Sequence, residues 1–347
     1  MKVLKFGGTS VGSAQRMKEV AKLITDGERK IVVLSAMSGT TNTLVEISDY
    51  LYKKNPEGAN EIINKLESKY RQHIDELFAT PEYKQKGLEL IKSHFDYIRS
   101  YTKDLFTLFE EKVVLAQGEL ISTAMMNYYL QECGVKSVLL PALEYMRTDK
   151  NAEPDPVYIK DKLQVQLELH PDAEIYITQG YICRNAYGEI DNLQRGGSDY
   201  TASLIGAAIN ASEIQIWTDI DGMHNNDPRI VDKTAPVRHL HFEEAAELAY
   251  FGAKILHPTC IQPAKYANIP VRLLNTMDPT APGTLISNDT EKGKIKAVAA
   301  KDNITAIKIK SSRMLLAHGF LRKVFEIFES YQTSIDMICT SEVGVDR

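Results

Sequence analysis

The sequence predicts an α/β fold in which a mainly parallel sheet is sandwiched by helices. Residues 31–34 are continuously apolar, which is typical of a parallel strand covered on both faces. A helical pattern separates them from an earlier strand at residues 3–6, and strand, helix and strand at this spacing form a right-handed crossover unit. Glycine- and hydroxyl-rich turns follow both strands, at the edge where open α/β sheets bind ligands.

Length and composition predict a globular protein of two domains. The chain has 347 residues, more than one domain usually contains, and 44% of them are hydrophobic and 25% charged. With 41 basic and 46 acidic residues the net charge is -5, which leaves no basic stripe for nucleic acid and no polybasic membrane anchor. Because no apolar run approaches roughly 18 residues and the first residues do not read as a signal peptide, we expect a cytoplasmic protein.

Cysteine and histidine spacing predicts no metal site. The four cysteines lie far apart and none belongs to a Cys-x-x-Cys pair, so neither a zinc site nor a disulfide framework is indicated. The histidines contain no i,i+4 pair. His239 and His241 share one face of a short strand, and we interpret them as a solvated surface pair rather than as metal ligands.

The first ten residues predict a phosphate-binding turn. A strand leads into Gly7-Gly8-Thr9-Ser10 and then into a helix that begins at Ser13. Glycines permit close backbone approach, the amides at the start of a helix point at an anion, and Lys5 adds a positive charge. The Walker pattern does not occur in the chain, so this is not an ordinary P-loop, and a turn with glycines for geometry alone is the competing interpretation.

A second polar turn follows the strand at residues 31–34. It reads Ser35-Ala36-Met37-Ser38-Gly39-Thr40-Thr41-Asn42. Because ligands collect at the carboxyl ends of strands in open α/β sheets, we expect this turn to face the same crevice as Lys5.

Residues 44–130 predict a helical insertion without a strand. Apolar side chains recur at three- and four-residue spacing in residues 61–79 and 82–110, Leu105 among them, as packed helices require. A further helix over residues 113–130 carries Glu119 in its apolar half. Since an unpaired buried carboxylate is costly, Glu119 is expected to have a cationic partner.

The stretch Arg195-Gly196-Gly197-Ser198-Asp199 predicts a second anion site. Arg195 can clamp a carboxylate, and Ser198 and Asp199 open a helix over residues 200–209 whose amino end attracts anions. Asp199 as a simple N-cap is the competing interpretation. Before this stretch we predict a strand at residues 135–140, a long polar loop at 144–155, a second strand at 174–178 and an irregular region at 180–194.

A third ligand-facing loop is predicted after a strand at residues 213–217. It contains Thr218 and Asp219 and continues to Asp227-Pro228-Arg229. A helix that begins near Phe242 then presents a second lysine, Lys254, at its end. Short strands finish this domain, at residues 271–274 and 284–286.

The carboxyl-terminal residues predict half of a small α/β module. After a linker at residues 291–299 the pattern is strand, helix and strand, at residues 304–309, 319–330 and 335–339. A ferredoxin-like unit needs about twice as many elements. The module therefore either borrows strands from another chain or belongs to a fragment.

Together these loops indicate phosphoryl-transfer chemistry, which needs positioning and charge neutralisation more than a covalent nucleophile. Six motifs, in this order, resemble those of the aspartokinases, a group with the amino-acid kinase fold. They are Lys5-Phe6-Gly7-Gly8-Thr9-Ser10, Gln117-Gly118-Glu119, Arg195-Gly196-Gly197-Ser198-Asp199-Tyr200-Thr201, Trp217-Thr218-Asp219, Asp227-Pro228-Arg229, and Phe251-Gly252-Ala253-Lys254 with His257-Pro258. The resemblance covers essentially the whole chain, and residues 300–347 are similar to the start of the ACT regulatory region.

The resemblance implies a catalytic amino-acid-kinase domain at residues 1–290 and a partial ACT domain at residues 300–347. It implies transfer of the γ-phosphoryl group of ATP to the β-carboxylate of L-aspartate, the first step of lysine, threonine and methionine biosynthesis. The cofactor would be ATP with Mg²⁺, the metal being held mainly by the phosphates. Further implied partners are an amino-acid effector at the ACT region and a second copy of the chain in a homodimer.

The resemblance also assigns roles to single residues. Those implied in catalysis are Lys5, Asp199 and Lys254. Those implied in aspartate binding are Thr41, Glu119, Arg195 and Ser198. Those implied in ATP binding are Gly7, Gly8, Ser35, Thr218, Asp219, His224 and Arg229.

Two positions depart from the pattern of the family. His224 stands where many members have a tyrosine beside the adenine, so we expect ATP use with altered affinity. His318 stands where an arginine is common in the effector region, which leaves lysine, threonine or no effector open. The alternatives to an aspartate kinase are another kinase of the same fold, for nucleoside monophosphates or carbamate, and a non-catalytic sensor of nucleotides or amino acids.

Overall fold

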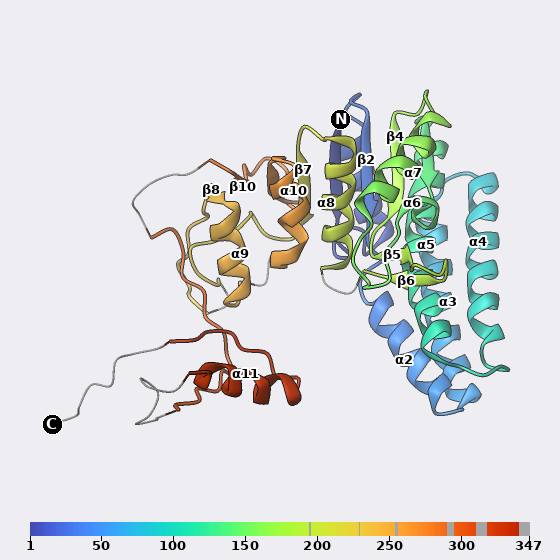
Figure 1. The fold of residues 1–347 in the computed structure, drawn as a ribbon. Coiled ribbons are helices and arrows are strands. Elements are labelled where there is room, and N and C mark those ends of the chain that lie inside the picture. The colour runs from blue at the N-terminus through green and yellow to red at the C-terminus, as the bar shows by residue number, and fades with distance from the viewer. Residues whose placement is uncertain (194–195, 229, 254–255, 290–294, 310–317, 340–347) are drawn as a thin grey trace. The chain divides into compact units, whose positions relative to one another are not determined.

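The computed structural model describes residues 1–193, 196–228, 230–253, 256–289, 295–309 and 318–339 (Figure 1). The chain divides into two compact units, Met1–Lys301 and Asp302–Arg347. The first unit contains an eight-stranded sheet with the order β3-β4-β2-β1-β7-β9-β10-β8. Its strands are β1 Lys2–Phe6, β2 Lys30–Leu34, β3 Ser137–Leu140, β4 Ile175–Gln179, β7 Ile214–Thr218, β8 His239–His241, β9 Val271–Asn275 and β10 Thr284–Ser287.

The sheet is mainly parallel, as predicted. β1 pairs in parallel with β2 and β7, β4 pairs with β2 and β3, and β9 pairs with β7, whereas β10 runs antiparallel to β9. Every residue of β2 is buried, in agreement with its continuous apolar sequence. The loops that follow β1, β2, β4, β7 and β9 therefore emerge at one edge of the sheet.

Helices cover both faces of this sheet (Figure 1). One layer contains α1 Ala14–Ile24, α2 Thr40–Tyr52, α3 Pro56–Leu77, α4 Pro81–Ser100 and α5 Leu108–Glu132. The other contains α6 Ala142–Tyr145, α7 Pro156–Glu168, α8 Gly197–Ile209, α9 Phe242–Tyr250, the 3-10 turn η1 Pro258–Ile261 and α10 Gln262–Tyr266.

Side-chain alternation along β1 decides which layer Lys5 faces. Leu4 and Phe6 belong to the core shared with helices α1 to α5, whereas Val3 belongs to the core shared with helices α6 to α10. Successive side chains of a strand point to opposite faces, so Lys5 lies on the same face as Val3. That face is covered by α8.

The predicted helical insertion is present as α2 to α5, but one of its helices was predicted too long. α4 ends at Ser100, and Leu105 lies in the following loop with 76% of its surface exposed. The reason is a competing helix start: Thr107 accepts from the amide of Phe109, and its own amide donates to Glu110, so that α5 begins at Leu108.

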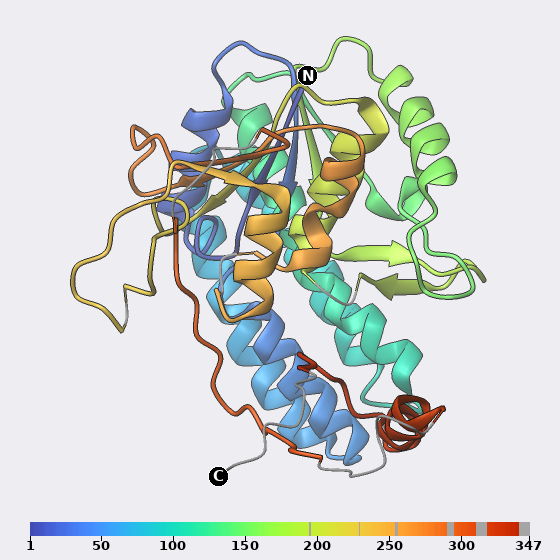
Figure 2. The ribbon, with the colours of Figure 1, turned by 60° about the vertical axis from the view of Figure 1, so that its left-hand side comes forward.

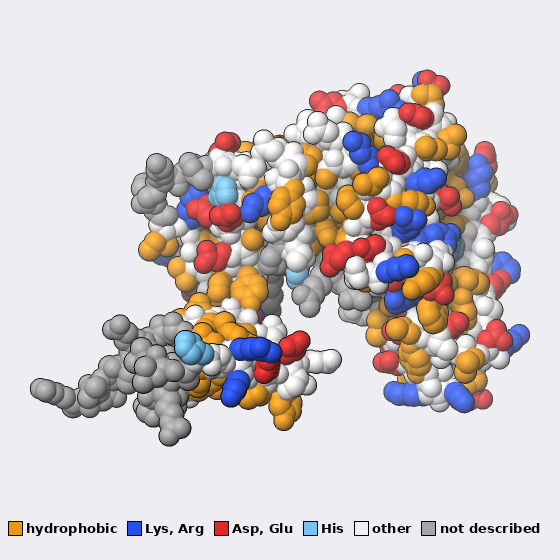
Figure 3. Space-filling model, in the orientation of Figure 1, with side chains coloured by type: hydrophobic (Ala, Val, Ile, Leu, Met, Phe, Trp, Pro, Cys, Tyr) orange, Lys and Arg blue, Asp and Glu red, His pale blue; other side chains and the backbone are white. Residues whose placement is uncertain are grey.

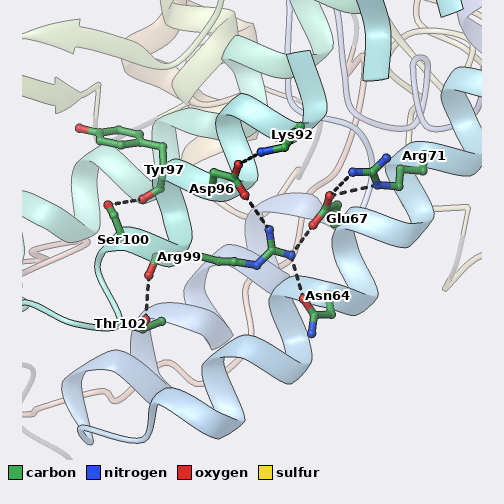
Figure 4. Close-up of polar contacts among 9 residues, drawn as sticks. All are labelled: Asn64, Glu67, Arg71, Lys92, Asp96, Tyr97, Arg99, Ser100 and Thr102. Carbon is green, nitrogen blue, oxygen red and sulfur yellow. Dashed lines mark hydrogen bonds and ion pairs between the residues drawn. The ribbon is translucent and has the colours of Figure 1, made fainter. Parts of the chain in front are cut away.

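An ionic network joins α3 to α4 inside the insertion. Figure 4 shows Glu67 of α3 between Arg71 of the same helix and Arg99 of α4. Arg99 also reaches Asn64 and Asp96. On the face shown in Figure 3, basic and acidic side chains are interspersed over these helices, with no broad area of one charge.

Several elements of the first unit were missed in the sequence, among them helix α7 and a short hairpin. α7 follows the polar loop, and its start is signalled by Asp155, which accepts from the amide of Tyr158, and by Pro156 in the first turn. The region predicted to be irregular contains an antiparallel hairpin of β5 Ile182–Arg184 and β6 Ile190–Asn192. Strands of three residues are too short to give a periodic signal.

The second unit contains helix α11, Phe320–Ser330, as predicted. The strands predicted at residues 304–309 and 335–339 are not formed, and their apolar side chains, such as Ile307 and Met337, are exposed. A strand needs a neighbour that pairs with its backbone, and the described residues of this unit offer none.

Candidate active site

The turns after β1 and β2 are joined by their backbones. The amide of Ser35 donates to the carbonyl of Phe6 at 3.2 Å, and the amide of Ser38 donates to the carbonyl of Gly8 at 3.2 Å. A Cβ atom on Gly8 would lie 2.8 Å from the carbonyl oxygen of Ala36, so a glycine is required for this close approach. The predicted meeting of these two turns is confirmed.

Lys5 forms an ion pair with Asp199. Its Nζ lies 2.7 Å from Oδ1 of Asp199, and the two side chains are 11% and 16% exposed. The buried Oδ1 has no well-aligned hydrogen bond among the described residues, so this ion pair compensates its charge. Asp199 therefore holds the Lys5 ammonium between β1 and the start of α8.

Asp199 is not the N-cap of α8. The helix begins at Gly197 and its N-cap is Gly196, in the left-handed region with φ 72° and without a side-chain cap. Ser198 and Asp199 thus lie in the first turn, where free amides and the helix dipole favour an anion. Ser198 accepts a 2.9 Å hydrogen bond from the hydroxyl of Ser35, which ties this turn to the loop after β2.

Glu119 enters the same region from α5. A Cβ atom on Gly118 would lie 2.7 Å from Cβ of Ala36, so the glycine lets α5 approach the loop after β2. Oε1 of Glu119 then accepts a 3.1 Å hydrogen bond from the amide of Ala36, while the buried Oε2 has no partner among the described residues. Burial raises the pKa of this carboxyl to about 7.

The described residues include no cationic partner of Glu119, and since Arg195 and Lys254 lie outside them, the expected partner stays a prediction. One carboxylate oxygen is stabilised by a backbone amide, and the second has no partner in the described part of the chain. An open cleft of about 370 Å³ is lined by Gly8, Ser35, Thr41, Glu119, Tyr181 and Ser198. We call it the α8 cleft.

Tyr181 in the wall of the α8 cleft was missed in the sequence. It lies between β4 and β5 in the left-handed region, with φ 69°, a conformation that is rare for a bulky residue and is often found at functional sites. The only sequence signal for this residue was its position directly after Gly180. In a region predicted to be irregular, nothing distinguishes one aromatic residue from another as part of a site.

The residues predicted to bind nucleotide follow β7, on the other side of β1. The amide of Gly7 donates to the carbonyl of Trp217 at 3.4 Å, so Thr218 and Asp219 begin beside the glycine turn. Asp219 is exposed to solvent. His224 lies farther along this loop, where its Nδ1 is 2.8 Å from the hydroxyl of Thr234.

Three predicted site residues, Arg195, Arg229 and Lys254, lie outside the described residues, and their roles stay predictions. In the part of the chain that is described, no three His, Cys, Asp or Glu side chains gather as metal ligands would. The described helices also include none with the length and apolar character needed to cross a membrane.

Comparison with known proteins identifies the family. Residues 1–275 match the amino acid kinase family. The chain is 35% identical to lysine-sensitive aspartokinase 3 of Escherichia coli, over 99% of its own length and 77% of that protein. The chain belongs to the amino acid kinase family and, within it, to the aspartokinases. It is also 38% identical to chloroplastic aspartokinase 1 of Arabidopsis thaliana, of which it spans 62%, less than two thirds of that relative.

Solved structures agree with this assignment. The family fold is seen in Escherichia coli aspartokinase III in complex with aspartate and ADP, with a TM-score of 0.82 and 32% identity over 99% of this chain and 77% of that one. The same protein in complex with lysine and aspartate gives a TM-score of 0.78 and 31% identity over the same shares. The predicted resemblance and fold class are thereby confirmed.

Proposed function

We propose that the chain transfers the γ-phosphoryl group of ATP to the β-carboxylate of L-aspartate and forms 4-phospho-L-aspartate, the first step towards lysine, threonine and methionine. The single observation that supports this proposal is that one region contains both a group for a ligand cation and a group for a ligand anion. The buried Oε2 of Glu119, which has no partner among the described residues, can accept from a ligand cation, and Lys5 offers a sheltered ammonium to a ligand anion. An amino acid that receives a phosphoryl group satisfies both.

The acceptor would bind in the α8 cleft. Oε2 of Glu119 would accept from the α-ammonium group, Thr41 and Ser198 would donate hydroxyl hydrogen bonds, and Arg195 would bind the α-carboxylate. The β-carboxylate would then lie towards Gly8 and Ser198, the lining residues nearest in sequence to the Lys5–Asp199 ion pair. Because a carboxylate is already ionised near neutral pH, its attack on phosphorus requires no general base.

The phosphoryl group would lie over the glycine turn. The amide of Gly8, the Lys5 ammonium and the amino end of α8 would stabilise negative charge there, Gly7 would leave room for close approach of the phosphate, and Lys254 would approach from the other side. Asp199 keeps Lys5 in place. Thr218, Asp219, His224 and Arg229 would line the remainder of the ATP site.

ATP would arrive as its Mg²⁺ complex, with the metal held mainly by phosphate oxygens. The donor set fits this arrangement, since the glycine turn supplies amides for phosphates rather than carboxylates for a metal ion. The cation would neutralise charge on the β- and γ-phosphates.

The second unit would take part in regulation and assembly. α11 is amphipathic and none of its described residues is buried, which supports pairing with a second copy in a homodimer. An amino-acid effector of this unit is proposed by analogy with the Escherichia coli relative, whose structure contains lysine.

Two assays over several acceptors test the proposal: ADP release reports phosphorylation of any acceptor, and trapping with hydroxylamine reports the acyl phosphate expected from aspartate. L-Aspartate should be turned over far faster than L-glutamate, carbamate or nucleoside monophosphates. Turnover with glutamate alone would assign a different kinase activity. No turnover with any acceptor, together with retained nucleotide binding, would favour a sensor.

A further inference from the structure

The β5–β6 hairpin directly follows Tyr181, which lines the α8 cleft, and the hairpin is too short to be stable by itself. Its two strands contain three residues each, and two-stranded hairpins are marginal in water without further packing. Tyr181 immediately precedes the hairpin, and its carbonyl accepts a 2.7 Å hydrogen bond from the amide of Leu193. The position of Tyr181 therefore depends on what anchors the hairpin.

An ion pair anchors the hairpin to α5. Nζ of Lys112 lies 2.7 Å from Oδ1 of Asp191, and the side chains are 21% and 13% exposed, so the pair is sheltered from solvent screening. Asp191 belongs to β6, where it lies opposite Cys183 of β5. Figure 2 shows the yellow-green arrows of the hairpin beside helix α5.

Lys112 is placed on the face of α5 that also carries Glu119. The two residues are seven positions apart, which is close to two full turns of an α-helix. The ion pair thus fixes the hairpin against the helix face that points into the α8 cleft. Tyr181 and Glu119 line this cleft together.

Tyr181 is held in a strained conformation by contacts on several sides. Its amide donates a 3.0 Å hydrogen bond to the hydroxyl of Thr201 in α8. A Cβ atom on Gly197 would lie 3.3 Å from Cδ2 of Tyr181, so the ring packs closely over the first residue of α8. A left-handed tyrosine persists only where its surroundings determine it fully.

The Tyr181 phenol is also influenced by the charge of the cleft carboxylate Glu119 and by that of Asp191 in the ion pair. Burial, and after it the negative charges of Glu119, Asp191 and Glu111, raise the pKa of Tyr181 to about 12. The ring therefore stays neutral and lies near the ion pair as well as near the cleft carboxylate.

We propose that Lys112 and Asp191 are positioning residues that hold Tyr181 as a fixed wall of the α8 cleft and thereby set how tightly the acceptor amino acid is bound. This inference rests on the proposed kinase function. Neither residue lines the cleft, so both act through Tyr181 and not on the reacting atoms.

Lys112→Met tests the inference, because it removes the charge and keeps the aliphatic stem. The KM for aspartate should rise about tenfold, while kcat and the KM for ATP change less than about twofold, because only acceptor binding is disturbed. In a Tyr181→Ala background the same substitution should have no further effect on the KM for aspartate. Exchange of the charges, Lys112→Asp with Asp191→Lys, should restore most of the loss.

Arg272→Met is the matched control. It breaks the ion pair of Arg272 in β9 with Glu213, at 3.1 Å with side chains 32% and 17% exposed, at a similarly sheltered site that does not belong to the hairpin. This variant should leave the KM for aspartate unchanged. Amide hydrogen exchange in residues 182–193 should become faster in Lys112→Met and not in Arg272→Met.

The inference is overturned if hairpin exchange becomes faster while the KM for aspartate stays the same, or if Lys112→Met and Tyr181→Ala have additive effects. The proposed function is tested separately: it is wrong if the wild-type protein does not phosphorylate aspartate. In that case calorimetric binding of aspartate to the wild type and to Lys112→Met decides the inference: a weaker variant supports it, and equal affinity or no binding overturns it.

Discussion

Oε1 of Glu119 accepts a 3.1 Å hydrogen bond from the amide of Ala36, while Oε2 of the same carboxylate is buried without a partner among the described residues. This arrangement fixes the side chain and leaves half of its hydrogen-bonding capacity for a ligand. Burial raises the pKa of Glu119 to about 7, so the free protein contains both protonation states near neutral pH. An ammonium group beside Oε2 favours the ionised state.

The affinity for aspartate should therefore increase with pH. Below the pKa of about 7 the ligand ammonium has to displace a proton from Glu119, and above it the carboxylate is already charged. In a pH series of kcat/KM for aspartate the value should rise by up to about tenfold per pH unit and level off above that pKa. Glu119→Gln should bind aspartate weakly and remove this rise. An equally steep rise in the variant would assign it to another group.

The same carboxyl should reduce the stability of the fold as the pH increases. Its pKa is raised from the 4.5 of an ordinary exposed glutamate to about 7 in the folded chain, so the folded state binds the proton more tightly and loses this advantage between these values. The loss is about 3 kcal/mol at 1.36 kcal/mol per unit. Urea unfolding should show Glu119→Gln gaining stability over the wild type between about pH 5 and about pH 8. A constant difference would contradict this account.

Alanine should be tolerated differently at the two glycines of the phosphate turn. On Gly8 the new Cβ would meet the Ala36 carbonyl at 2.8 Å, which should cost about 2 kcal/mol of stability and disrupt the turn. On Gly7 the nearest atom, Nζ of Lys5, would be at an ordinary 3.5 Å. Gly7→Ala should keep its Tm and lose mainly kcat/KM for ATP. Thermal unfolding and ATP kinetics of both variants check this difference.

Glu67→Gln should destabilise the helical insertion and spare catalysis. Burial opposes ionisation of Glu67, but the hydrogen bonds from Arg99 and Arg71 outweigh it and lower its pKa (Figure 4). Loss of the charge should cost about 2 kcal/mol at neutral pH, and the difference should shrink as acid protonates the wild-type carboxyl. Denaturant titrations at several pH values measure it. An altered KM for aspartate would show that the network acts on the cleft.

Much of the fold could be predicted because local pattern and burial agree. The apolar run of β2 is buried throughout, and Ser13 caps α1 where the helix was expected to begin. Predictions failed where structure depends on distant partners. Residues 304–309 have an apolar pattern typical of a strand but no neighbour to pair with among the described residues. The end of α4 was misplaced for a local reason, because the capping box of Thr107 and Glu110 starts α5 at Leu108.

In the candidate site, residues of the glycine-rich loops were found because their types imply anion binding. Alternation along β1 could have indicated that Lys5 faces α8, but its pairing with Asp199 needs the register of β1 against that helix. Tyr181 was missed because its position depends on a left-handed backbone conformation and on close packing against Gly197. Neither feature produces a periodic pattern in the sequence. The predicted convergence of Lys5 with Lys254 stays a prediction, since Lys254 lies outside the described residues.

Comparison of Lys5→Met with the wild type tests the central claim most directly, because Lys5 is assigned to the migrating phosphoryl group and not to the acceptor. The account predicts that kcat for ATP-dependent phosphorylation of aspartate falls about a thousandfold while the calorimetric Kd for aspartate changes less than about threefold. Lys2→Met, which removes an exposed lysine from the same strand, should change neither value. A Lys5→Met protein that keeps wild-type turnover would contradict the account.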